Sequence, residues 1–186
     1  MVALSLFSIV VLVCVGALLA LVGANKKAQA LQAVMNDLNI TVDSMARNMR
    51  EGTAYNCNST VPPSVTTDDG NCPGGDLHVS FTPFWVASSD PQLNSKRWVY
   101  RFTPPSGSNG GYIERSKDGG LSYTRLTSRD VSLSSVTFFV VGTSISDSIQ
   151  PRVTVVVKGT GGQVTDLRTS STFHIEASAV QRELDL

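Results

Sequence analysis

The feature that most constrains this chain is a long stretch without charge at its start. No charged side chain precedes Lys26, and the segment Val2–Ala24 is mostly apolar. A helix needs about 20 apolar residues to cross a bilayer. The rest of the chain is rich in Ser, Thr, Gly and Val, as in soluble domains. The sequence therefore predicts a membrane-spanning half-helix over residues 1–24, followed by a soluble part.

The pattern after Asn25 predicts that the same helix continues to residue 51. Proline, the strongest helix breaker, first occurs at Pro62, and Gly52 is a plausible stop. Fifty helical residues would form a rod about 75 Å long. Over residues 25–51, apolar side chains recur at spacings that place them on one helix face. This apolar stripe consists of Ala28, Leu31, Met35, Leu38, Val42, Met45 and Met49.

The apolar stripe has two candidate partners. It could pack against the sheet of its own head, or it could form a subunit interface in a helical bundle. We expect both, at different heights of the rod. Part of the stripe must be covered by the head, because an exposed stripe of this length would promote aggregation.

The apolar segment could also be a cleavable secretory signal. Val22, Gly23 and Ala24 are small residues of the kind that signal peptidase accepts. The apolar run is, however, longer than the usual core of a signal peptide, and no basic segment precedes it. We therefore expect a retained anchor. Lys26 and Lys27 conflict with an external head, because the positive-inside rule would place them in the cytoplasm.

The head, residues 52–186, is predicted to be an antiparallel meander. Residues 53–76 are dense in turn-forming residues and predict a loop, and Gly159–Gly162 predicts a turn. A helix followed by antiparallel strands is an α+β arrangement, here a lollipop whose helix covers one sheet face. The expected strands are Leu77–Val86, Arg97–Phe102, Tyr112–Arg115, Leu121–Leu126, Val131–Val141, Pro151–Lys158 and Val164–Ala177.

The three cysteines divide between the two parts of the chain. Cys14 lies in the apolar segment, where a thiol packs like an apolar residue. Cys57 and Cys72 flank a polar loop, and in a head outside the cytoplasm we expect them to form a disulfide across the loop 57–72. The alternative is two free thiols in a reducing compartment.

The composition argues against general nucleic-acid binding, and the motifs argue against catalysis. The formal net charge is zero, whereas a general nucleic-acid binder carries a basic excess. Nucleophile-elbow, Walker and zinc-protease motifs are absent from the sequence. His78 and His174 are isolated and are interpreted as strand residues. We therefore expect no enzymatic activity, no cofactor and no metal.

Three further patterns allow a functional and a structural interpretation. Asp68, Asp69, Asn71 and Asp76 could supply oxygen ligands for calcium, but turn chemistry is the favoured interpretation. Lys96, Arg97 and Arg101 interleave with Trp98 and Tyr100, as in single-stranded nucleic-acid sites. Strand alternation instead predicts core aromatics with a solvated basic face. Residues 116–123 resemble the Asp-box hairpin of sialidases, a turn remote from catalysis, through Ser116, Asp118, Gly120 and Tyr123.

The first 52 residues resemble the N-terminal helix of type IV pilins and type II secretion pseudopilins, most closely their larger minor subunits. The late segments LTSRDVSLSSVTFFV and FHIEASAVQREL resemble strands of such heads more loosely. The resemblance implies a pilin-like fold, a single-pass inner-membrane location with an extracytoplasmic head, and assembly through bundled helices. The implied partners are other pilin or pseudopilin subunits, the inner-membrane assembly platform and the lipid bilayer. The family's early glutamate is not present here, where the first acidic residue is Asp37.

Two functions follow as hypotheses. The favoured one is a structural minor subunit of a type IV pilus, type II secretion or competence filament. The alternative is a membrane-anchored extracytoplasmic module that binds DNA or a surface ligand.

Overall fold

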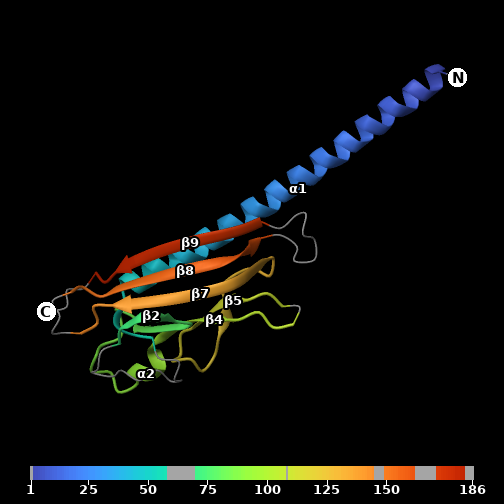
Figure 1. Cartoon of the computed structure of the whole chain (residues 1–186). Helices are drawn as coiled ribbons and strands as arrows, with labels where there is room; N and C mark the ends of the chain where they lie inside the picture. The colour runs from blue at the N-terminus through green and yellow to red at the C-terminus, as the bar shows by residue number, and fades with distance from the viewer. Residues whose placement is uncertain (1, 58–69, 108, 145–148, 162–170, 183–186) are drawn as a thin grey trace.

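A single helix dominates the computed structural model, which describes residues 2–57, 70–107, 109–144, 149–161 and 171–182. This helix, α1 (Val2–Arg50), runs without interruption for 49 residues. Its first half projects from the head and its second half lies along it (Figure 1). The expectation of one continuous helix is confirmed.

The end of α1 is capped by groups from the head. The backbone amide of Gly52 donates to the carbonyl of Met49 at 3.1 Å. The hydroxyl of Tyr55 donates to the carbonyls of Met49 and Gly52. The backbone amide of Arg182 donates to the carbonyl of Arg50 at 2.8 Å. These donors satisfy carbonyls that a helix terminus leaves unpaired. Burial raises the pKa of the Tyr55 phenol, so this donor keeps its proton.

The head contains two antiparallel sheets, so the predicted single meander is wrong. The first sheet has the order β1-β3-β4-β5-β6 and the second β2-β7-β8-β9. The first consists of β1 (Thr53–Asn56), β3 (His78–Thr82), β4 (Trp98–Thr103), β5 (Tyr112–Ser116) and β6 (Thr124–Arg125), with the short helix α2 (Leu93–Lys96) before β4. The second consists of β2 (Cys72–Asp76), β7 (Val131–Val141), β8 (Arg152–Gly161) and β9 (Ser171–Val180).

Several predicted boundaries need correction. The predicted loop 53–76 contains β1 and β2, and the predicted strand Leu77–Val86 ends at Thr82. Strand β8 continues through the predicted glycine turn to Gly161. There a Cβ atom would lie only 2.8 Å from Val34 Cγ1, so Gly161 allows α1 to approach the sheet. Residues 162–170, where part of the last strand was predicted, lie outside the described residues.

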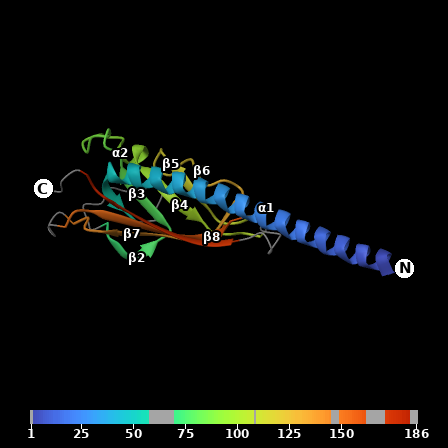
Figure 2. The same cartoon turned by 90° about the horizontal axis from the view of Figure 1, so that it is seen from above.

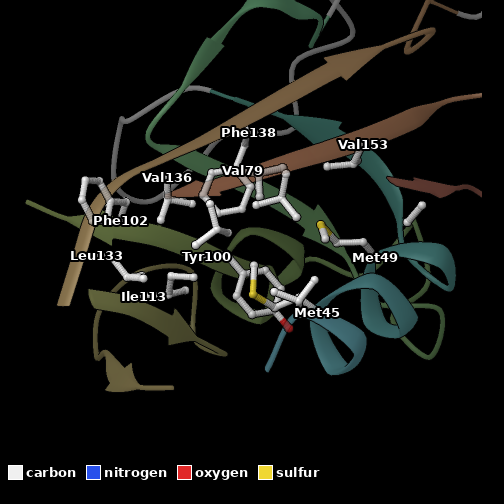
Figure 3. Close-up of a cluster of buried hydrophobic side chains, with 14 of the residues drawn as sticks. Met45, Met49, Val79, Tyr100, Phe102, Ile113, Leu133, Val136, Phe138 and Val153 are labelled. Carbon is white, nitrogen blue, oxygen red and sulfur yellow. The ribbon is translucent and has the colours of Figure 1, made fainter. Parts of the chain in front are cut away.

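One core joins the helix to both sheets. Alternate residues of β7 point inward, and Leu133, Val136 and Phe138 are fully buried. Figure 3 shows them meeting Val79, Tyr100, Phe102 and Ile113 of the first sheet, Val153 of the second, and Met45 and Met49 of α1. Seen from above, α1 runs lengthwise over the head (Figure 2). The α+β arrangement is therefore confirmed, with the helix packed on both sheets.

Candidate functional site

The exposed half of α1 is the most conspicuous surface of the molecule. Side chains from Val2 to Lys26 are exposed, including Phe7 and Leu12 at 67% and 75%. By length and composition α1 could cross a membrane, although a signal sequence near the N-terminus would pass the same test. None of its most apolar stretch is buried inside the head. The fold thus leaves a large apolar rod without a partner among the described residues.

The head covers the upper part of the apolar stripe and leaves the lower part open. Ala28 is exposed, whereas Leu31 and Met35 are half-buried. Higher up the rod the stripe is buried, at Leu38, Val42, Met45 and Met49, together with Val34. The stripe therefore changes from partly covered to fully buried within one helical turn of Val34.

Polar contacts fix the upper half of α1 in its position. The Asp37 carboxylate accepts from the backbone amide of Ser128 at 3.0 Å. The Asn48 side-chain amide donates to the hydroxyl of Tyr100, also at 3.0 Å. These bonds lie about three helical turns apart and hold the rod in one rotational setting against the head.

A row of small residues on the exposed rod was missed in the sequence. Gly16, Ala20 and Ala24 follow each other at intervals of four and so lie on one helix face. A Cβ atom at Gly16 or Gly23 would meet nothing within 4 Å. Small residues at this spacing allow helices to approach closely in membranes. The row could have been recognised in the sequence from the four-residue spacing of its members, but not from their apolar character.

The predicted disulfide between Cys57 and Cys72 is present, with Cα atoms 6.0 Å apart. Cys57 follows β1 of the first sheet, and Cys72 begins β2 of the second. The bond therefore links the two sheets as well as closing the loop. Cys14 is free and exposed on the rod.

Replacing Cys57 and Cys72 with serine should destabilise the head by about 3 kcal/mol, the chain-entropy value for a loop of this length. The melting temperature should fall by roughly 6–12 °C. Thermal unfolding of the detergent-solubilised protein measures this, with Cys14→Ser as the matched control. Equal melting temperatures for both variants, or free Cys57 and Cys72 thiols in non-reducing peptide maps, would contradict the expectation.

The Asp-box-like residues form the turn between β5 and β6. Ser116 Oγ donates to Asp118 Oδ1 at 2.6 Å and accepts from the amide of Gly120 at 2.8 Å. Asp118 also accepts from the amides of Leu121 and Ser122, at 3.1 and 2.9 Å. The Tyr123 ring lies outside this network, 3.5 Å below the Arg101 guanidinium. The arrangement is a closed turn that uses the polar atoms of Asp118 internally.

The Asp118 turn should loosen in acid. Hydrogen bonds from Ser116 and then Ser122 lower the pKa of Asp118 from 3.8 to about 2. A carboxyl group whose pKa is lower in the folded state stabilises the fold at pH values above its unfolded-state pKa. This stabilisation is lost as the pH falls from about 4 to about 2. Amide exchange of Gly120 and Ser122 should accelerate over this range in excess of its intrinsic pH dependence. Asp118→Asn should abolish that excess, whereas Asp43→Asn, on the exposed face of α1, should preserve it.

The basic and aromatic residues around β4 are only partly as predicted. Trp98 and Tyr100 are buried on the helix side, as expected of core aromatics. Arg97 is fully buried, so the predicted solvated basic face is wrong at this residue. Its guanidinium donates to the Ala54 carbonyl at 2.7 Å and to the hydroxyls of Thr82 and Ser80. Desolvation lowers the pKa of Arg97 to about 10.

The remaining candidates show no assembled site among the described residues. Groups of three or more metal-ligating side chains are not found there. Asp76 Oδ1 accepts from the His78 backbone amide at 3.0 Å, and Asn71 Oδ1 accepts from that of Thr143. Asp68 and Asp69 lie outside the described residues. His174 is exposed on β9.

Comparison with known proteins gives no family assignment. No protein-family model matches the chain, and no curated protein or solved structure matches it. The resemblance of residues 1–52 to type IV pilins therefore stays a prediction.

Proposed function

We propose that this chain is a minor subunit of a filament of the type IV pilus or type II secretion kind. The observation that supports this most is the division of α1. Its first half is charge-free and exposed, whereas its second half is fixed to the head by buried side chains and polar bonds. A lone membrane anchor needs no rigid connection to its head. A subunit that enters a helical bundle does.

The same proposal gives the chain's location and partners. It is a single-pass protein of the inner membrane, with its head outside the cytoplasm, where the Cys57–Cys72 bond persists. The exposed rod packs against the rods of other pilin or pseudopilin subunits, at first in the bilayer on the assembly platform. This role is structural and requires no catalysis.

Photocrosslinking in cells tests the proposal. A photoreactive residue at Val13, 62% exposed on the rod, should form adducts with proteins that carry a similar N-terminal helix. The same residue at Ile40, 72% exposed beside the head, controls for labelling of any exposed position. The proposal is wrong if Val13 labels only lipid, or if mass spectrometry shows that the mature protein begins at Asn25.

A further inference from the structure

An exposed aromatic cluster lies on the head near the end of α1. The turn after β3 carries Phe84 and Trp85, which are 64% and 59% exposed. The amide of Val86 donates to the carbonyl of Pro83 at 3.0 Å, which closes this turn. A small groove is lined by this turn together with Asn48 and Glu51 at the end of the helix. Two adjacent large aromatics at this exposure are unusual on a soluble head.

The cluster is anchored on a buried ring. Phe84 and Trp85 pack edge to face with their ring centroids 5.1 Å apart. Trp85 in turn packs edge to face on Trp98, at 5.3 Å. Trp98 is 8% exposed and belongs to the core. The two outer rings are thereby held in fixed orientations and lose little entropy when a ligand binds.

Two cations lie beside the innermost ring of the cluster, that of Trp98. The Arg115 guanidinium and the Lys117 ammonium lie 5.1 and 5.0 Å from the Trp98 ring centroid. Neither forms an ion pair with a carboxylate of the described residues. Two neighbouring positive charges without a counter-ion favour an anion between them. Glu51 is the one acid among the described residues that line the groove.

A lipid surface is too far away to be the ligand. Asn48 lies 24 residues beyond Ala24, the end of the apolar segment. At the rise of an α-helix, this places the groove about 36 Å further along the rod. The ligand is therefore a soluble molecule outside the membrane.

We infer that the patch formed by Phe84, Trp85, Trp98, Arg115 and Lys117 binds single-stranded nucleic acid. Unpaired bases stack on exposed rings, while Arg and Lys contact the phosphates between them. A duplex keeps its base faces stacked inside and cannot use Phe84 and Trp85 in this way. The inference does not depend on the proposed filament role, since an anchored head could bind the same ligand.

Fluorescence provides a direct test, because Trp85 and Trp98 are the two tryptophans of the chain. A 15-nucleotide oligothymidylate should quench their emission when added to the full-length protein in detergent. With two phosphate contacts, the affinity should fall with salt at a log–log slope of about −1.4. Lys117→Gln should reduce this slope to about −0.7. Trp85→Ala should weaken the binding of dye-labelled oligothymidylate at least ~5-fold.

Matched variants separate the patch from the rest of the surface. Lys158→Gln, exposed on β8, and Ile40→Ala, exposed on α1, should leave the affinity unchanged. The inference is overturned if oligothymidylate does not bind, or if Trp85→Ala and Ile40→Ala bind it equally. Equal affinity for duplex DNA or polyglutamate also overturns it and would indicate a site for polyanions or acidic proteins instead.

Discussion

Replacing Met45 with aspartate is expected to lower the melting temperature of the head by about 6–20 °C. Met45 is fully buried between α1 and the sheets. A carboxylate there loses its hydration without gaining a partner. Such a group costs about 3–5 kcal/mol, and each kcal/mol corresponds to about 2–4 °C in a protein of this size.

A matched substitution lies on the opposite face of the same helix. Ile40 is 72% exposed, so Ile40→Asp introduces the same charge without burying it. Its melting temperature should remain within about 2 °C of the parent, because surface substitutions rarely change stability by more than ~0.5 kcal/mol. Equal effects of Met45→Asp and Ile40→Asp would show that the upper stripe is not packed against the head in solution.

Replacing Leu31 with aspartate should abolish assembly while the head stays folded. Leu31 is half-buried, below the point where the head fully covers the stripe. In the proposed filament it packs against neighbouring rods, where a carboxylate would be desolvated without a partner. Co-purification of partner subunits from detergent extracts should fall to background, and the melting temperature should change far less than with Met45→Asp.

Gln32→Asp is the control for charge at this height of the rod. Gln32 is exposed and lies off the stripe, so its aspartate variant should retain the partners. If Leu31→Asp assembles normally in cells, the bundling role is wrong. The head would then be better explained as an anchored binding module.

The helix was predictable because its determinants are local. Alternating spacings of three and four residues specify an apolar face whatever that face contacts. The absence of proline before Pro62 and the glycine at position 52 set the end of the helix. The point at which the head begins to cover the stripe was not predictable to better than a turn. It depends on Gly161, which is 127 positions from the Val34 side chain that it accommodates.

The sheets were less predictable because their partners are distant in sequence. Strands β1 and β2 lie in the turn-rich segment 53–76, and their hydrogen-bond partners are the distant strands β3 and β7. The burial of Arg97 depends similarly on acceptors from Ala54, Ser80 and Thr82. Strand alternation correctly predicted that Arg97 and Trp98 point to opposite faces of the sheet. It could not show that both faces are covered by the rest of the head near these two residues.

The candidate nucleic-acid patch illustrates the same limit. The only interleaved basic and aromatic residues singled out in the sequence were those within 96–101, whose rings were correctly predicted to lie in the core. The exposed rings come from the segment Pro83–Val86, which looked like the end of a strand, and the cations come from β5 and the turn after it. Cross-strand pairing of Phe81 with Trp98 and of Tyr100 with Arg115 brings these segments together. Only the register of β3, β4 and β5 could have revealed this arrangement.

The lengthwise packing of α1 determines how the molecule carries mechanical load. The buried seam runs from Val34 to Met49 beside β9 (Figures 1 and 2). A pull along the rod tries to slide the helix over the sheet, so the contacts along the seam resist it together. A pull across the seam would instead break these contacts one at a time. Tension on the rod is therefore shared by the whole seam, and the head should withstand strong axial force while yielding more easily to a sideways pull.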